Sequence, residues 1–179
     1  MRVITGTARG RRLKEPADMR IRPTTDMVKE SIFNIIQFQV EGARVLDLFA
    51  GTGQLGIEAL SRGAEECVFV DSSRESLKLC RENVEFCELA ARAKFANTDA
   101  MSYLKSGEKF DIVFLDPPYD TDLLENAIKS AVMFDILREN GIMVCESRKD
   151  KSLPDPEREG YSKREYKYGK IKLTVFRKG

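Results

Sequence analysis

Apolar residues fall into short runs that alternate with segments of helical periodicity. Five runs rich in Val, Ile, Leu, Ala and Phe predict buried β-strands. They cover residues 43–48, 67–70, 93–96, 110–115 and 142–145. Apolar positions three and four residues apart predict helices. These cover residues 25–37, 54–62, 72–87 and 123–132. The third is opened by a capping box, Ser72-x-x-Glu75, which predicts Ser72 as its cap. This alternation predicts a Rossmann-like α/β fold with a mostly parallel sheet and helices on both of its faces.

The two ends of the chain depart from this alternation. Residues 161–168 and 170–176 flank Gly169 and predict a closing hairpin, which brings the sheet to seven strands, one of them antiparallel. Residues 3–5 and 12–14 could pair around a turn at 7–10. We therefore interpret residues 1–22 as a β-hairpin appendage and residues 23–179 as the main domain. A chain of 179 residues has room for one such domain and little more.

Charge is distributed unevenly, although the formal net charge is only +1. Residues 1–22 hold seven basic and two acidic residues, and residues 148–179 hold eleven and five. The stretch between them is acidic, so the basic ends are expected to meet a polyanion such as RNA. The alternative is that they only keep the protein soluble. Because arginine binds phosphate in a bidentate way, the expected contacts are N-terminal. They are Arg9, Arg11, Arg12, Lys14, Arg20 and Arg22.

Composition narrows the possible classes of protein. There is no histidine, and the four cysteines form no C-x-x-C pair, so we expect no bound metal and no histidine-dependent catalysis. The cysteines are expected to be reduced core thiols of a cytoplasmic protein. The chain shows neither the long apolar run of a membrane helix nor the apolar segment of a signal peptide. The expected state is a monomer away from membranes.

The first predicted strand leads into a glycine-rich turn that opens a helix. The turn reads Asp47-Leu48-Phe49-Ala50-Gly51-Thr52-Gly53. Its glycines allow a sharp bend and a close approach to a ligand, and the following helix start presents free N–H groups. Asp71 ends the second strand, where a carboxylate can accept hydrogen bonds from ribose hydroxyls. The pattern therefore predicts a nucleoside site.

Asp47 favours one kind of nucleoside over another. A carboxylate at this strand end would repel the pyrophosphate of a dinucleotide, but it would attract the sulfonium and ammonium groups of S-adenosylmethionine. The alternative is that the N–H groups of the turn satisfy Asp47, and both interpretations can hold together. A dehydrogenase is disfavoured by Asp47 and by the lack of room for a second domain.

A second motif, Asp116-Pro117-Pro118-Tyr119, follows the fourth predicted strand. Its prolines remove two backbone donors, so carbonyl acceptors remain without competing N–H groups. With the carboxylate and the aromatic ring, the segment can hold a planar base by an exocyclic amine. The plainer alternative is a Pro-Pro turn with a capping acid. Acids follow four predicted strands and should converge at one edge of the sheet. They are Asp47, Asp71, Asp99 and Asp116.

Together, the two motifs resemble those of the class I S-adenosylmethionine-dependent methyltransferases that act on exocyclic amines. Other segments are similar to the bacterial family that methylates the 2-amino group of guanine in small-subunit (16S) ribosomal RNA. These are Arg2–Gly6, Arg9–Leu13, Arg22–Thr24 and Glu58–Ala64. The resemblance covers nearly the whole chain.

The resemblance implies S-adenosylmethionine as cofactor and ribosomal RNA, or a small-subunit ribonucleoprotein particle, as partner. It also implies that Asp116 and the Pro117 carbonyl hold the guanine amine while Tyr119 stacks on the base. The implied cofactor pocket comprises Thr24, Asp47, Phe49, Ala50, Gly51, Thr52, Gly53, Asp71, Ser72, Asp99, Ala100 and Asp116. Two of these have plainer alternatives, since Asp99 could only cap a helix and Phe49 could only pack in the core.

Two further functions stay open. The D-P-P-Y motif also occurs in DNA and RNA adenine amino-methyltransferases, although a DNA enzyme would be expected to carry an inserted recognition domain, for which this chain has no room. A non-catalytic ribosome-assembly factor with the same fold is the other alternative. The intact Asp116, Pro117 and Tyr119 argue against it.

Overall fold

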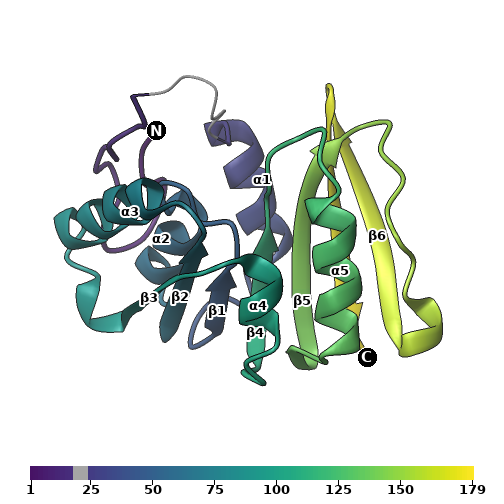
Figure 1. Ribbon diagram of the computed structural model, residues 1–179. Coiled ribbons are helices and arrows are strands. Elements are labelled where there is room, and N and C mark those ends of the chain that lie inside the picture. The colour runs from purple at the N-terminus through teal and green to yellow at the C-terminus, as the bar shows by residue number, and fades with distance from the viewer. Residues whose placement is uncertain (18–23) are drawn as a thin grey trace.

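The computed structural model describes residues 1–17 and 24–179. Arg20, Arg22 and the boundary expected before residue 23 lie outside these residues. The strands form one seven-stranded sheet in the order β3-β2-β1-β4-β5-β7-β6 (Figure 1). Their bounds are β1 (Arg44–Asp47), β2 (Glu66–Asp71), β3 (Ala93–Asn97), β4 (Phe110–Leu115), β5 (Leu137–Arg148), β6 (Tyr161–Tyr168) and β7 (Ile171–Lys178).

Strand direction follows the expected pattern. The pairs from β3 through β5 are parallel, whereas β7 is antiparallel to both β5 and β6. A mostly parallel seven-stranded sheet with one antiparallel strand is therefore confirmed.

Helices cover both faces of the sheet. Helices α1 (Asp26–Ile35), α2 (Gln54–Ser61) and α3 (Arg74–Phe86) contribute to one buried cluster, and α4 (Ala100–Leu104) and α5 (Leu123–Met133) contribute to the other. Figure 1 shows α4 and α5 in front of the sheet. Because both faces are covered, β4 is apolar except at Asp111, and Val45, Leu46 and Asp47 of β1 are all buried. None of the described helices is long and apolar enough to cross a membrane.

Strand β5 is longer at both ends than the apolar run at 142–145 predicts. At its start, Leu137 pairs with Phe110, and the register then shifts before Ile142 pairs with Ile112. Residues 138–140 are exposed, and Asn140 has a positive φ of 63°. At its other end, β5 continues through Arg148 because β7 pairs with it there. The polar residues at both ends concealed the strand.

The N-terminal segment folds back around the turn at 7–10, and its strand pairing there is one antiparallel bridge between Arg2 and Arg12. Backbone hydrogen bonds from the Val3 N–H to the Arg11 carbonyl (3.0 Å) and from the Gly10 N–H to the Val3 carbonyl (2.9 Å) accompany this bridge. Its apolar side chains Val3, Ala8 and Leu13 are buried in the cluster formed with α1, α2 and α3. The segment is too short to pair extensively, so burial of these side chains against the helices holds it instead.

A buried acid, Glu58 of α2, anchors this segment. Its carboxylate accepts hydrogen bonds from the backbone N–H groups of Ile4 (2.8 Å) and Thr5 (3.0 Å). Arg62 donates to it at 3.0 Å, and the Lys29 ammonium lies 3.7 Å away. Glu58 and Lys29 are both fully buried. Burial lowers the pKa of the Lys29 ammonium, and the Glu58 carboxylate opposes that shift.

A second link joins the segment to the glycine-rich turn. The Asn83 side chain of α3 donates to the carbonyl oxygens of Lys14 and Thr52, each at 3.1 Å, and accepts from the Lys14 N–H at 2.8 Å. One buried amide therefore connects three parts of the chain that are distant in sequence.

Replacing Glu58 with alanine should destabilise the protein strongly. The change leaves Lys29 buried without its acid and removes the acceptor of two backbone N–H groups. Loss of one partner of a buried ion pair costs about 3–5 kcal/mol. Urea unfolding measures this cost. Glu85→Ala, at an exposed position of α3, is the control and should change the free energy of unfolding by less than about 0.5 kcal/mol. Equal effects of the two variants would refute an anchoring role for Glu58.

Candidate functional site

The candidate site lies where the strand order reverses. From β1 the chain proceeds outward to β2 and β3 and then returns to β4 on the other side of β1. Asp47 pairs with Phe114 across these two parallel strands, so Asp47 and Asp116 leave neighbouring strand ends. Ligands of open α/β sheets bind at this reversal, beyond the carboxyl ends of the strands.

Two glycines shape the turn after β1. Gly51 and Gly53 have positive φ angles of 55° and 84°, which other residues rarely adopt. A Cβ on Gly53 would lie 2.5 Å from the Cys80 sulfur, so this position is packed. A Cβ on Gly51 would meet no atom within 4 Å, so the space over Gly51 is open. The turn thus combines a rigid inner side with an accessible backbone.

Asp71 organises the opposite side of the turn. One carboxylate oxygen accepts from the Gly51 N–H and the other from the Ser73 N–H, both at 2.8 Å. The cap of α3 is Ser73, whose side chain accepts from the Ser76 N–H, and not Ser72 as the capping-box pattern predicted. Each Asp71 oxygen keeps a further lone pair for a ligand hydroxyl.

Asp47 is almost completely buried below this turn. Its carboxylate accepts from the Gly56 N–H of α2 at 3.0 Å. A backbone N–H group therefore satisfies Asp47 in part, as the alternative interpretation of this acid expects. Burial raises the pKa of the Asp47 carboxyl to about 7, and the Asp71 carboxylate adds to the rise while the Gly56 hydrogen bond opposes it. A cation beside the turn would favour the ionised form.

The other expected cofactor residues lie around the same strand ends. Asp99 caps α4, because its carboxylate accepts from the Ser102 N–H at 3.0 Å, and its other oxygen makes no such cap contact. Ala100 is buried directly after it. Ser72 is exposed, and Phe49 is half-buried against the cluster under α4 and α5. Core packing of Phe49 is therefore observed.

The Asp-Pro-Pro-Tyr segment lies beside the start of α1. The Thr24 hydroxyl is within hydrogen-bonding distance of Asp116 Oδ2 (2.9 Å) and Glu146 Oε2 (3.2 Å). The Gln54 amide pairs with the Thr24 backbone and fixes its position. Burial raises the pKa of the Asp116 carboxyl well above its ordinary value, and the Glu146 carboxylate raises it further.

Tyr119 is held at the rim of this cluster. Its hydroxyl donates to Glu146 Oε1 at 2.7 Å. The Arg148 guanidinium lies over the ring, 5.7 Å from its centre, and also pairs with Asp120 at 2.9 Å. A pocket of about 250 Å³ opens here, lined by residues 117–121, Leu124, residues 146–148, Asp150 and Lys151. One face of Tyr119 is thus covered by Arg148.

Three residues of this site were missed by sequence reasoning. Glu146 could have been found, because it directly follows the apolar run at 142–145, as the other acids follow their strands. Gln54 and Asn97 carried no such signal. The Asn97 amide donates to the Asp71 and Ser72 carbonyl oxygens at 3.0 and 3.2 Å and fixes the end of β2.

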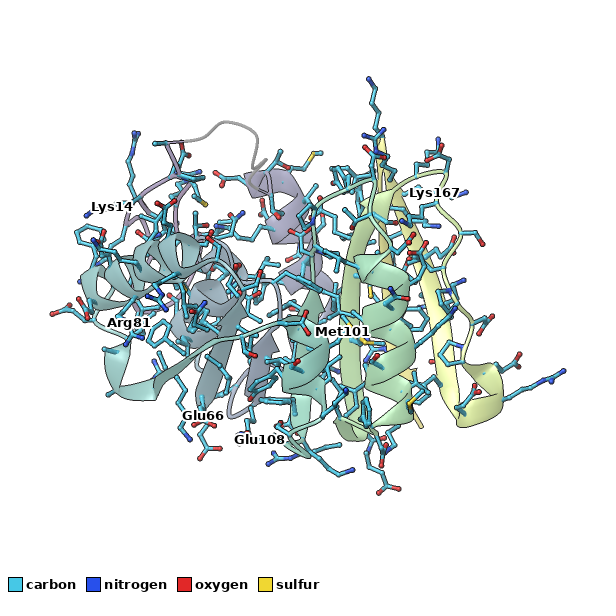
Figure 2. The ribbon with its side chains drawn as sticks, viewed as in Figure 1. Lys14, Glu66, Arg81, Met101, Glu108 and Lys167 are labelled. Carbon is cyan, nitrogen blue, oxygen red and sulfur yellow. The ribbon has the colours of Figure 1, made fainter. Side chains whose placement is uncertain are left out.

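Basic residues flank the site. In Figure 2, Lys14 and Lys167 lie at the edge of the molecule where the strands carrying these acids end, and Glu66 and Glu108 lie at the opposite edge. Among the expected nucleic-acid contacts, Arg9 and Arg12 are exposed. Arg11 donates to Glu88 at 2.7 Å and to the Phe86 carbonyl, and Lys14 pairs with Glu82 at 3.0 Å. Arg11 therefore has a structural function of its own.

Metal-binding side chains do not gather here. Within residues 1–17 and 24–179, no group of three His, Cys, Asp or Glu side chains could hold a metal ion. All four cysteines are free and buried.

Comparison with known proteins places this arrangement in a family. The family model described as conserved hypothetical protein 95 matches residues 1–177. The chain is 40% identical to the putative rRNA methyltransferase YlbH of Bacillus subtilis, over 99% of both chains. It is 37% identical to ribosomal RNA small subunit methyltransferase D of Escherichia coli K12, over 86% of this chain and 78% of that protein.

A solved structure is also similar to this protein over nearly the whole chain. The putative methyltransferase yhhF of Escherichia coli superposes with a TM-score of 0.86 and 33% identity, covering 99% of this chain and 97% of that one. This agreement includes the N-terminal segment and the closing strands. The chain therefore belongs to the conserved hypothetical protein 95 family and has the Rossmann-like fold of S-adenosylmethionine-dependent methyltransferases.

Proposed function

We propose that this protein methylates the exocyclic 2-amino group of a guanine in small-subunit ribosomal RNA. The observation that carries the proposal is the position of Asp116, with its adjoining proline carbonyl and Tyr119, at the strand reversal beside the glycine-rich turn. The relatives that act on ribosomal RNA match this chain over most of its length and support RNA as the substrate.

The turn fits S-adenosylmethionine, which is the cofactor and supplies a methyl group activated on a sulfonium. The open space over Gly51 admits the ligand, and the remaining lone pairs of Asp71 would accept from its ribose hydroxyls. Asp99, whose second oxygen is not engaged in the cap, would accept from the adenine amine beside Ala100. Ala50, Thr52, Gly53 and Ser72 complete this wall, with Phe49 packed beside it. Thr24 would contact the methionine end.

The base side follows from Asp116 and its neighbours. Asp116 and the Pro117 carbonyl accept the two N–H bonds of the guanine amine, which turns its lone pair toward the methyl group. The amine nitrogen bonds to the methyl carbon as the carbon–sulfur bond breaks and its electron pair passes to sulfur. The nitrogen is left with one proton in excess. Tyr119 stacks on the base.

A base inside an RNA helix cannot reach such a pocket, so the target guanine is unpaired or turned out of the helix. Phosphate contacts would offset that cost and set the register of the RNA. The exposed Arg9, Arg12, Lys14 and Lys167 would make them, and Figure 2 shows Lys14 and Lys167 at the edge where the strands end.

Replacing Asp116 with alanine should abolish most methyl transfer and leave S-adenosylmethionine affinity nearly unchanged, because its partner is the base. The expected loss in rate is about 10²–10⁴-fold. Mass spectrometry of nucleosides from small-subunit ribosomal RNA transcribed in vitro identifies the product. Asp122→Ala, at an exposed acid after the motif, is the control and should keep full activity. Methyladenine in place of 2-methylguanine would overturn the assigned base.

Replacing Asp47 with asparagine should separate its effect on stability from its effect on cofactor binding. The folded carboxyl has a pKa of about 7, above that of the unfolded chain, so its contribution to stability declines as pH rises from about 4 to 7. Asparagine has no such proton, and the variant should gain stability relative to wild type across that range. Calorimetry should show S-adenosylmethionine affinity lowered by roughly 1 kcal/mol or more through loss of the charge. Unchanged affinity would make Asp47 purely structural.

Replacing Arg9 and Arg12 together with alanine should weaken RNA binding and leave cofactor binding unchanged. Each lost phosphate contact should flatten the slope of log affinity against log salt by roughly 0.7–0.9. A double variant at the exposed Arg81 and Arg158 removes the same charge elsewhere and serves as control. If the slope matches that of the control, RNA recognition is not carried by the N-terminal segment, and the basic residues of β6 become the next candidates.

A further inference from the structure

We infer that Glu146 is a positioning residue for the base side of the reaction: its carboxylate holds Tyr119 in place, and its charge makes Asp116 a better acceptor for the amine proton. This inference rests on the proposed function, because it assigns a destination to the proton released from the methylated amine.

Glu146 is enclosed between the two halves of the base site. It follows Cys145, which pairs with Leu115, so it leaves β5 beside Asp116 of the neighbouring strand. Its side chain is only 6% exposed. One oxygen accepts from the Tyr119 hydroxyl at 2.7 Å, and the other lies 3.2 Å from the Thr24 hydroxyl. Glu146 thus links Tyr119, the proposed stacking residue, to the Thr24 hydroxyl that also contacts Asp116.

The Thr24 hydroxyl cannot satisfy both acids. It carries one proton, yet it lies 2.9 Å from Asp116 Oδ2 and 3.2 Å from Glu146 Oε2. Two carboxylates this close, with Glu146 buried, repel each other when both are ionised. Burial first and then the Glu146 charge raise the pKa of the Asp116 carboxyl, so Asp116 binds a proton more readily than an ordinary aspartate.

Other groups around Asp116 in the described part of the chain modify this effect. Asp47 on β1 raises the pKa of Asp116 further, and the hydrogen bond from Thr24 lowers it. Cys145 on β5 is a buried thiol whose own pKa is raised by burial, so it stays neutral. Tyr119 directs its hydroxyl to Glu146.

The excess proton on the methylated nitrogen can therefore pass to Asp116. An ionised Asp116 oxygen accepts the proton and becomes a neutral carboxylic acid, while Glu146 keeps its hydrogen bond from the Tyr119 hydroxyl. Water takes the proton from Asp116 when the product leaves. At low pH, Asp116 is already protonated and cannot accept, so the rate of methyl transfer should fall as pH decreases.

Glu146→Gln tests the charge with little change of shape, because the amide oxygen can still accept from Tyr119. Two readouts are needed: the pH titration of the Asp116 carboxyl carbon by NMR in the ligand-free protein, and the pH profile of single-turnover methyl transfer. Loss of the Glu146 charge should move the midpoint of the Asp116 titration to lower pH. The pH at which the rate of methyl transfer falls on the acidic side should move down with it. The rate at the plateau should also fall, because a weaker base accepts the proton less well.

Tyr119→Phe provides the complementary test of position. It removes the hydrogen bond to Glu146 and keeps both carboxylates, so it should raise the KM for RNA and leave the Asp116 midpoint near its wild-type value. Glu139→Gln makes the same chemical change at an exposed position of β5 and should alter neither readout. Thr24→Val removes the bond that lowers the pKa of Asp116 and should move the midpoint to higher pH, which keeps the inference testable if Glu146→Gln does not fold.

The outcomes separate this inference from the proposed function. If wild-type protein forms no 2-methylguanine, the proposed function fails, whereas the NMR titration still reports on the two acids. If wild-type protein forms 2-methylguanine but Glu146→Gln leaves the midpoint and the acidic limb where they were, the inference about Glu146 is wrong and the proposed function stands.

Discussion

The common direction of the strands from β3 through β5 is the constraint on which the rest of the structure depends. Parallel strands bring their carboxyl ends to one edge of the sheet, so residues that are far apart in sequence meet there. Asp47, Asp71, Asp116 and Glu146 converge for this reason. Helices on both faces keep water from the strands, and the acids at their ends are consequently buried to different degrees. Burial then changes their affinity for protons.

Regular elements could be predicted from the sequence because local pattern and tertiary packing agree there. The apolar run at 110–115 became β4 with the same bounds, since both of its faces are covered. The glycine-rich turn could also be predicted, because Gly51 and Gly53 have positive φ angles, which residues other than glycine rarely adopt. The acids at the strand ends follow from the same pattern, as position in a parallel sheet determines which edge they reach.

Other features depended on contacts that no local pattern shows. The pattern of the N-terminal segment indicates a hairpin, but it does not show that Glu58 and three buried apolar side chains hold the segment against the helices. Ser72 was expected to cap α3, whereas Asp71 bends the chain so that Ser73 takes that position. Glu146 was overlooked because the predicted strand stopped one residue before it, although pairing with β7 extends β5 to Arg148.

The Asn83 amide has a consequence for how the two ligands influence each other. It ties the backbone of Lys14, at the basic end of the chain, to the Thr52 carbonyl in the glycine-rich turn. A ligand that stiffens one of these segments alters the freedom of the other through the same side chain. Thermodynamic reciprocity then requires that any effect of RNA on cofactor affinity be matched by an equal effect of the cofactor on RNA affinity. With RNA on the N-terminal segment, as proposed, Asn83 would provide a physical route for cooperativity between ligands that share no contact.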